Sequence, residues 1–250
     1  MGRILKAPSK SPPRGDLRKI FIIQILSQTL RSAIKHIVAH TYRPLLVRYL
    51  SKTRVYKYDD IKLEIPPQVF HPGFFFSTRL LLNYINHLPL QGKSFLELGC
   101  GSGLISIYAA RKGAKVTATD INPIAIEFLR KNSQQNMSEI MIIQSDLFKD
   151  IPVQQFDMIA INPPYYKKQP LSDLDYAWFC GENGEYFEAL FEGLNNYVHE
   201  HSDVIMVLFE GCDIEMIENS AVQNGFNLRC IHIHKNLLEK NFIFKIEKIK

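Results

Sequence analysis

The stretch that decides the fold is Ser94-Phe95-Leu96-Glu97-Leu98-Gly99-Cys100-Gly101-Ser102-Gly103. Its first five residues are mostly apolar and predict a short buried strand. The glycines that follow predict a tight turn in which a ligand can approach the backbone closely. The pattern is Gly-x-Gly-x-Gly after an acid, and it differs from the Gly-x-Gly-x-x-Gly of dinucleotide-binding proteins because Leu104 follows Gly103. We therefore expect a ligand-binding turn at the carboxyl end of the first strand of a sheet.

From this turn onward, predicted strands alternate with helical patterns. The predicted strands span residues 94–98, 115–119, 140–144, 156–161, 204–209, 226–232 and 241–246. Helical patterns between the first five strands are typical of a doubly wound, mostly parallel sheet with helices on both faces. The short connection at residues 235–240 predicts that the last two strands form an antiparallel edge. We expect an α/β fold with a seven-stranded sheet, in which ligands bind beyond the carboxyl ends of the strands.

Acidic residues lie at or after the ends of the first three predicted strands. Asp120 ends the second strand, where a carboxylate can accept hydrogen bonds from both hydroxyl groups of a ribose. We expect Asp146 to accept an adenine amine, and Glu97 to orient the glycine turn or bind the ligand's amino group. Each acid also has a structural interpretation, as a loop brace, a helix cap or a turn. Their occurrence together with the glycine turn predicts a site for an adenosine-containing ligand.

The tetrapeptide Asn162-Pro163-Pro164-Tyr165 follows the predicted strand at 156–161. Each proline fixes its own φ and pushes the residue before it toward extended backbone, so Asn162 should be held rigidly. The Asn162 carboxamide can then donate and accept hydrogen bonds in one plane. Tyr165 adds a flat apolar face. A strand-ending turn is the structural alternative, whereas the functional interpretation is a pocket for a planar nitrogen, either a nucleobase amine or a carboxamide.

This ordered set of motifs resembles the class I S-adenosylmethionine-dependent methyltransferases, and more narrowly their Asn-Pro-Pro-Tyr amino-methyltransferase branch. That branch includes the release-factor glutamine methyltransferases and the methyltransferase small domain enzymes that methylate adenine or guanine amines in RNA or DNA. The resemblance covers residues 55–210. It implies a Rossmann-like methyltransferase fold, S-adenosylmethionine as the cofactor, and methyl transfer to an amine or amide nitrogen.

The resemblance also implies roles for individual residues. Catalysis is expected of Asn162, Pro163 and Tyr165, with Asn162 and the Pro163 carbonyl accepting hydrogen bonds from the acceptor NH₂. The residues expected to bind the cofactor are Glu97, Gly99, Gly101, Gly103, Asp120, Asp146 and Asn162. The residues expected to bind the substrate are Pro164, Tyr165 and Tyr166.

Residues 55–250 are predicted to form the methyltransferase domain, beginning with a hairpin and a cofactor lid at 55–90. Ser77 or Thr78 is expected to cap the helix that follows the lid. In release-factor enzymes an acid usually follows the threonine of this segment, whereas Arg79 follows Thr78 here. Candidate base-stacking residues are Phe74, Phe75, Phe76, Tyr166 and Trp178, and the alternative is that the phenylalanines form an apolar lid.

Residues 1–54 are predicted to form a basic extension with a disordered start and an amphipathic helix. Residues 1–57 carry a net charge of +12, against +5 for the whole chain, which leaves −7 for residues 58–250. A basic segment on an acidic domain favours a nucleic acid partner, with RNA preferred to DNA. We therefore expect a nucleobase amine in RNA as the acceptor. The alternative is a glutamine exposed on a protein substrate.

Several other classes of protein are disfavoured. An NAD-dependent oxidoreductase would share the glycine turn and Asp120 but would leave Asn162 to Tyr165 unexplained. The four cysteines lack zinc-ligand spacing and a disulfide pattern, so we expect no metal and a cytoplasmic location. The apolar run at 20–26 is too short to span a membrane. The basic N-terminus also resembles a transit peptide, an alternative that the sequence leaves open.

Overall fold

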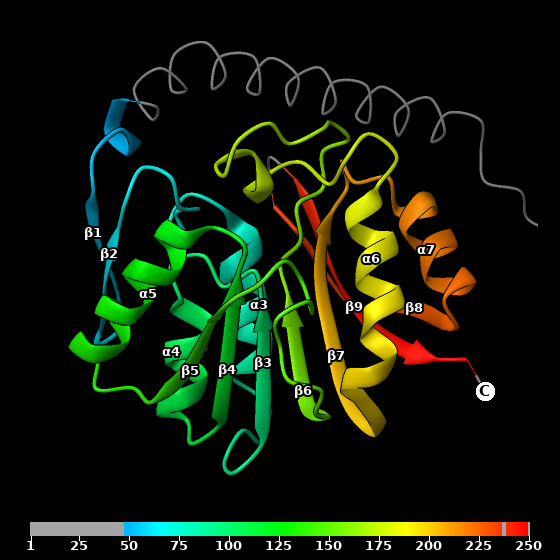
Figure 1. The fold of residues 1–250 in the computed structure, drawn as a ribbon, viewed down its shortest axis with the longest axis horizontal. Helices are drawn as coiled ribbons and strands as arrows, with labels where there is room; N and C mark the ends of the chain where they lie inside the picture. The colour runs from blue at the N-terminus through cyan, green and yellow to red at the C-terminus, as the bar shows by residue number, and fades with distance from the viewer. Residues whose placement is uncertain (1–47, 237–238, 250) are drawn as a thin grey trace, which may run out of the picture. The chain divides into compact units, whose positions relative to one another are not determined.

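The structure, a computed structural model, describes residues 48–236 and 239–249. The extension predicted for residues 1–54 lies outside the described residues as far as residue 47. A seven-stranded sheet has the strand order β5-β4-β3-β6-β7-β9-β8 (Figure 1). Its strands are β3 (Ser94–Leu98), β4 (Lys115–Asp120), β5 (Ile140–Gln144), β6 (Phe156–Ile161), β7 (Val198–Phe209), β8 (Phe226–Lys235) and β9 (Lys240–Lys248).

The pairing of the strands confirms the expected Rossmann-like methyltransferase fold. Strands β3 to β7 pair in parallel, whereas β9 pairs antiparallel with both β7 and β8. The order runs outward from β3 in both directions, so the chain crosses over between β5 and β6 (Figure 1). That crossover is the switch point at which doubly wound sheets place ligands.

Helices cover both faces of the sheet. They are α3 (Phe76–Ile85), α4 (Leu104–Arg111), α5 (Pro123–Gln135), α6 (Glu185–Leu194) and α7 (Ile214–Gln223), with short 3₁₀ turns η2 (Asp175–Ala177) and η3 (Asn195–Tyr197). Successive strand residues point to opposite faces, so β3 sends Phe95 to one apolar core and Leu96 to the other. The first core also contains α3, α4 and α5, and the second contains α6 and α7.

A separate hairpin precedes the sheet and leads into the segment that covers the site. Strands β1 (Arg54–Tyr58) and β2 (Ile61–Ile65) pair antiparallel around Asp59, whose φ of 49° forms the turn. Alternate residues of β2 are buried in the core that includes α4 and α5. The hairpin was predicted from the alternation of polar and apolar residues, and the structure confirms it.

The structure corrects two local predictions. Strand β7 begins at Val198 rather than at residue 204, because a register shift and a hydrogen bond from Ser202 to the Phe156 carbonyl let its polar first half join the sheet. The predicted cap of α3 is also wrong. Phe75 occupies the N-cap position and makes no side-chain hydrogen bond there, whereas Thr78 faces the site.

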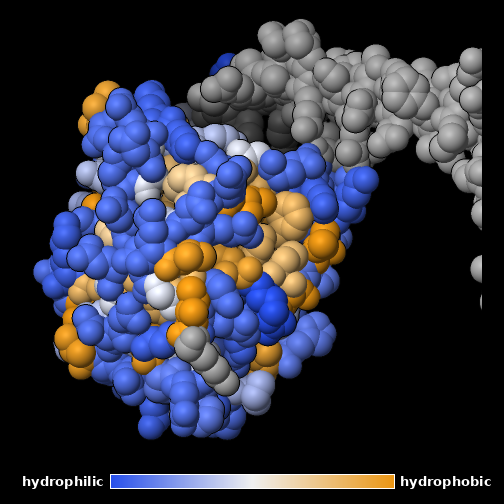
Figure 2. Space-filling view, turned by 90° about the vertical axis from the view of Figure 1, so that its right-hand side faces the viewer, coloured by the Kyte–Doolittle hydropathy of each residue, from blue (hydrophilic) through white to orange (hydrophobic). Residues whose placement is uncertain are grey.

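On the face turned toward the viewer in Figure 2, a band of apolar side chains crosses the middle and right, bordered by hydrophilic ones. The exposed apolar residues of α7, β8 and the chain end beside them are Val222, Ile233 and Ile249. Across the described residues, no helix has the length and apolar character needed to cross a membrane. The same part of the chain contains no cluster of three or more His, Cys, Asp or Glu residues able to hold a metal ion.

Candidate cofactor and acceptor site

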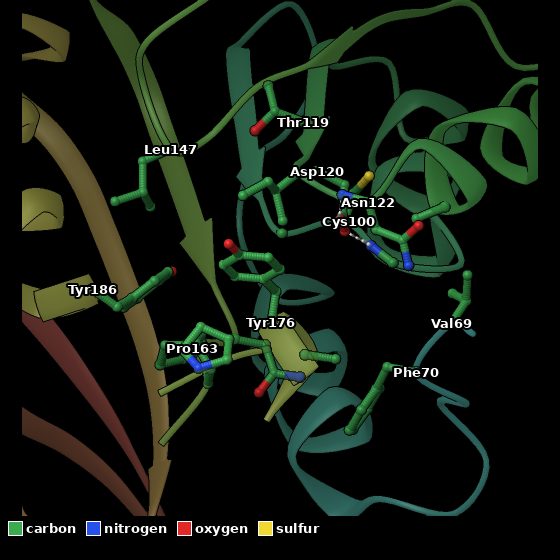
Figure 3. A pocket seen from close by; sticks show the side chains of 18 of the residues that line it. Val69, Phe70, Cys100, Thr119, Asp120, Asn122, Leu147, Pro163, Tyr176 and Tyr186 are labelled. Carbon is green, nitrogen blue, oxygen red and sulfur yellow. Dashed lines mark hydrogen bonds between the residues drawn. The ribbon is translucent and has the colours of Figure 1, made fainter. Parts of the chain in front are cut away.

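A cavity of about 400 Å³ opens at the carboxyl ends of β3, β4, β5 and β6. Its walls come from the glycine turn, from the strand-end acids, from residues 68–72 after the hairpin, and from the loop after β6. In Figure 3, Asp120, Asn122 and Cys100 lie on one side of the cavity, with Pro163 and Tyr186 opposite them. The sequence motifs therefore meet at one site, as ligand pockets at sheet switch points do.

The glycine turn presents bare backbone to the cavity. Gly99 lines the cavity with φ at +72°, and a Cβ there would meet no atom within 4 Å, so it would project into open space. Gly103, with φ at +82°, does not line the cavity, since a Cβ at this position would come within 2.1 Å of Leu129 on α5. Gly99 thus leaves room for a ligand, and Gly103 lets helix α5 pack against the turn.

Asp120 fixes the shape of that turn from the end of β4. Its Oδ2 accepts a hydrogen bond from the Gly101 N–H at 2.8 Å, and its Oδ1 accepts one from the Asn122 N–H at 2.9 Å. Burial raises the pKa of Asp120, and these backbone donors partly offset the rise. Each carboxylate oxygen has further lone-pair capacity, so Asp120 can also accept from a ligand hydroxyl in the cavity that it lines.

Glu97 is the most deeply buried acid of the cavity. It accepts a hydrogen bond from the Ser106 hydroxyl on α4, and its burial raises its pKa to about 8. The Asp120 charge adds to this rise. Among the residues that the structure describes, Glu97 forms no ion pair, and a ligand amino group would supply a cationic partner.

Asp146 and Leu147 follow β5 at the outer wall of the cavity. The Asp146 carboxylate is 46% exposed and pairs with Lys149 at 2.5 Å. Leu147 has a φ of 51°, which is unusual for a residue with a Cβ, and its side chain lines the cavity (Figure 3). Leu147 therefore supplies an apolar surface beside the acid, as an adenine ring would require.

Asn162 has one half of its carboxamide anchored and the other half free. Its Nδ2 donates to the Thr78 Oγ1 at 3.4 Å. Its Oδ1 is buried and has no hydrogen-bond partner among the described residues. A buried acceptor without a partner is costly, and in native proteins such groups call for an explanation. Since Asn162 lines the cavity, a ligand N–H is the partner that fits.

The residues after Asn162 form an apolar wall. Pro163 and Pro164 are buried and line the cavity together with Tyr165. The Tyr165 ring packs edge-on against Phe209 at 4.9 Å. Tyr166 is 46% exposed and is not among the residues that line the cavity.

An aromatic cluster joins the predicted lid to the loop after β6. The Phe70 ring lies 4.3 Å from Phe75 and 5.4 Å from Trp178, and Phe75 lies 5.0 Å from Trp178. The Trp178 carbonyl accepts hydrogen bonds from the Tyr165 and Tyr166 N–H groups. Of these three clustered rings, only Phe70 lines the cavity. The geometry matches the apolar lid better than a set of free base-stacking surfaces.

Sequence reasoning missed several residues that line the cavity, among them Asn122, Tyr176 and Tyr186. Asn122 precedes Pro123 and caps α5, and its Nδ2 also donates to the Gln68 carbonyl at 2.9 Å. Its position just before a helix-starting proline is a signal that could have identified it. Tyr176 and Tyr186 come from the loop after β6 and from the start of α6 (Figure 3). Neither of these tyrosines follows a periodic pattern that distinguishes it from other surface aromatic residues.

The fold and the cavity together define a class I S-adenosylmethionine-dependent methyltransferase, whose cofactor matches the backbone cradle, the strand-end acids and the apolar wall at Leu147. The chain matches the model of the methyltransferase small domain family over residues 61–178. It is also 35% identical over 156 residues to a "Putative protein N5-glutamine methyltransferase" of Methanocaldococcus jannaschii, covering 60% of this chain and 76% of that protein. The chain belongs to the methyltransferase small domain family.

Other relatives in this class carry different names. A ribosomal RNA small subunit methyltransferase C of Hamiltonella defensa is 33% identical over 119 residues, covering 47% of this chain and 35% of that protein. The chain therefore spans about a third of that relative's length. A methyltransferase structure from Pyrococcus furiosus has a TM-score of 0.59 at 19% identity, covering 85% of this chain and all of that one. At that identity, the likeness confirms the fold alone.

Proposed function

We propose that this enzyme methylates the side-chain amide nitrogen of a glutamine in a protein substrate. The observation that carries methylation of a planar NH₂ group is the buried Oδ1 of Asn162 beside Pro163, which has no hydrogen-bond partner among the described residues. An amide NH₂ offers two donors in one plane, which the Asn162 Oδ1 and the Pro163 carbonyl would accept. Those two hydrogen bonds would hold the acceptor nitrogen facing the cofactor cavity.

The role of the protein is chiefly to position the acceptor. S-adenosylmethionine supplies a methyl group activated by bonding to a positively charged sulfur, so the site needs little further chemical activation. Hydrogen bonds to Asn162 and Pro163 would draw the amide lone pair out of conjugation and orient it toward the methyl carbon. As the N–C bond forms, the S–C bond of the cofactor would break to leave S-adenosylhomocysteine, and the nitrogen would lose one proton to solvent after alkylation. Tyr165 contributes a wall rather than a base, because burial raises the pKa of its phenol and keeps it protonated.

The cofactor-binding roles follow from the same geometry. The glycine turn would receive the amino acid part of the cofactor, with Glu97 facing its amino group. Asp120 would accept from the ribose hydroxyls, and Asp146 with Leu147 would hold the adenine. Each assignment rests on the position of these residues around the cavity and on the hydrogen-bonding capacity left to them.

Three observations support glutamine over the RNA base that the sequence favoured. Residues 58–250 carry a net charge of −7, whereas binding of a phosphate backbone calls for a positive groove. Phe75, Phe76 and Trp178 pack against other rings rather than standing free to stack on a base. The match to this chain covers 76% of the relative named for glutamine methylation, but only 35% of the relative named for ribosomal RNA methylation.

RNA remains the second candidate because residues 1–57 carry a net charge of +12. A basic segment of this kind supplies phosphate contacts in nucleic-acid-binding proteins. In that case a nucleobase amine would occupy the same hydrogen-bonding positions, after the base has left its stack.

The test is methyl transfer from radiolabelled S-adenosylmethionine into protein, RNA and DNA fractions of cells that lack this enzyme. We expect label in protein, recovered as N5-methylglutamine on hydrolysis. Asn162→Ala should abolish transfer while the dissociation constant for the cofactor stays within about twofold, because the lost group contacts the acceptor. Asn183→Ala is the matched control, since the Asn183 side chain is exposed and its Nδ2 donates to the Glu185 carboxylate. Label confined to RNA would refute the glutamine assignment.

A further inference from the structure

Three asparagines, two at the caps of α5 and one within it, bind the main chain of β2 and of the segment after β2 that covers the cofactor cavity. The Asn122 Nδ2 donates to the Gln68 carbonyl at 2.9 Å. Asn132 exchanges hydrogen bonds of 2.8 and 3.1 Å with the N–H and carbonyl of Glu64. Asn136 exchanges the same pair of hydrogen bonds with the N–H and carbonyl of Lys62, at 3.0 and 2.7 Å. All three carboxamides are buried.

The spacing of these contacts makes them a ladder. As the helix runs from 122 to 136, its partners run backward from 68 to 62. Between the last two contacts, four helical residues rise about 6 Å and two extended residues of β2 span about 6.6 Å, so the spacings match. Gln68 lies in the turn after β2, where the Val69 N–H donates to the Pro66 carbonyl. Strand β2 is therefore docked antiparallel to α5 by side chains that bind only its backbone, and Asn122 binds the turn that follows the strand.

Asn132 differs from the other two members because it also reaches the glycine turn. Its Nδ2 donates to the Ser102 carbonyl at 3.1 Å as well as to the Glu64 carbonyl, and the side chain is 0% exposed. Ser102 lines the cavity, and the neighbouring Gly101 N–H is held by Asp120. The glycine turn is thus held from β4 on one side and from α5 on the other.

We propose that the three asparagines form a latch that sets the position of residues 66–72 over the cavity, and that Asn132 couples this segment to the glycine turn. Asn132 is then a positioning residue for S-adenosylmethionine binding, although it does not line the cavity. The inference depends on the cofactor and not on the identity of the methyl acceptor. A test of this inference therefore gives the same answer whether or not glutamine is the methyl acceptor.

Asn132→Asp and Asn136→Asp form a matched pair of variants for the test. Each replacement keeps an oxygen for the hairpin N–H, removes two N–H donors, and places a carboxylate against two carbonyl oxygens. In Asn132→Asp the two carbonyls are those of Glu64 and Ser102. In Asn136→Asp they are the main-chain carbonyls of Lys62 and Asn132. Only the first variant disturbs the glycine turn directly.

We expect Asn132→Asp to raise the calorimetric dissociation constant for S-adenosylmethionine at least about tenfold. Asn136→Asp should stay within about twofold of the parent, although both variants should lose thermal stability. Equal dissociation constants for the two variants would refute the coupling role of Asn132. If the buried carboxylate prevents folding, Asn132→Ser and Asn136→Ser make the same comparison without a charge.

Amide hydrogen exchange gives a readout that does not depend on turnover. The Val69 and Phe74 N–H groups both donate to carbonyls of the covering segment, those of Pro66 and His71. In the parent, S-adenosylmethionine should slow exchange at these amides. In Asn132→Ser this slowing should be reduced, and in Asn136→Ser it should persist. Full protection in both variants would show that the latch does not connect the segment to the cofactor.

Discussion

At the scale of single residues, the site is organised by carboxylates and carboxamides that bind backbone before any ligand arrives. Asp120 holds the glycine turn, and Thr78 holds one end of the Asn162 carboxamide. Two groups keep hydrogen-bonding or charge capacity for a ligand, the Asn162 Oδ1 and the Glu97 carboxyl. The first fits a ligand N–H, and the second fits a ligand amino group. Preorganisation of this kind lowers the cost of ordering the site when ligands bind.

Removal of the Asp120 carboxylate should chiefly weaken cofactor binding. Asp120→Ala leaves the Gly101 and Asn122 N–H groups without their acceptor, so we expect a dissociation constant for S-adenosylmethionine about tenfold to a hundredfold higher. Turnover at saturating cofactor should change less. Asp157→Ala is the control, because Asp157 binds the Ser94 N–H at the opposite end of the sheet. An unchanged affinity in Asp120→Ala would contradict the assignment.

The raised pKa of Glu97 should make stability depend on pH. Burial raises this pKa from 4.5 to about 8, so the folded protein keeps a proton that the unfolded chain releases. The associated contribution to the free energy of unfolding is fully present below pH 4.5 and is lost as pH rises through about 8. The thermal unfolding midpoint of the cofactor-free protein should therefore fall over this range.

Glu97→Gln should flatten that fall, because an amide of the same shape can still accept from the Ser106 hydroxyl but does not titrate. Parallel melting curves of the parent and the variant, recorded over the same pH series, make the comparison. The same slope in both proteins would show that other groups, including Asp120 with its own raised pKa, control the pH dependence.

At the scale of elements, the covering segment after β2 and the loop after β6 meet through aromatic rings. Phe70 contacts both the cavity and Trp178, whose carbonyl holds the backbone of Tyr165 and Tyr166. The cofactor side and the acceptor side of the site therefore share a contact. A ligand that displaces Phe70 would therefore also shift Trp178, and with it the backbone of the acceptor motif at Tyr165.

Fluorescence should report this contact, because Trp178 is the only tryptophan in the sequence. We expect titration with S-adenosylmethionine to change the Trp178 emission, and Phe70→Ala to remove most of that change. Phe74→Ala is the control, since Phe74 packs against Tyr49 and His71 instead. A full signal in Phe70→Ala would show that the cofactor reaches Trp178 by another route.

Local sequence patterns predicted the elements whose neighbours are close in the chain. Strand β6 and the glycine turn were located because apolar runs, prolines and glycines act over a few residues. The first half of β7 was missed because its side chains are polar and its pairing with β6 depends on a distant bulge. The partners of Asn132 and Asn136 lie 68 and 74 residues away, so no local pattern revealed them.

At the scale of the whole molecule, the two apolar cores have different tasks. The core with α3, α4 and α5 supports the hairpin and the glycine turn, whereas the core with α6 and α7 supports the strands beyond β6. The described cavity is lined entirely by residues between 68 and 189. Its cofactor side therefore lies within the domain that follows residue 47.

Deletion of residues 1–47 should leave the dissociation constant for S-adenosylmethionine within about twofold of the full chain, since the deletion keeps every lining residue that the structure describes. Calorimetry on both proteins checks this expectation. If a basic segment serves RNA binding, the same deletion should also abolish a salt-dependent affinity for RNA. A large loss of cofactor affinity would mean that the deleted residues complete the cavity.

The asparagine ladder on α5 has a consequence for how this protein can change over evolution. Carboxamides that bind only N–H and carbonyl groups place no demand on the side chains of the hairpin they hold. Outward-facing positions of β2, such as Lys62, are therefore free to accept substitutions without loosening the hairpin. Selection would fall instead on Asn132 within α5 and on its two cap residues. Hairpin sequences in relatives should diverge while asparagine persists at 122, 132 and 136.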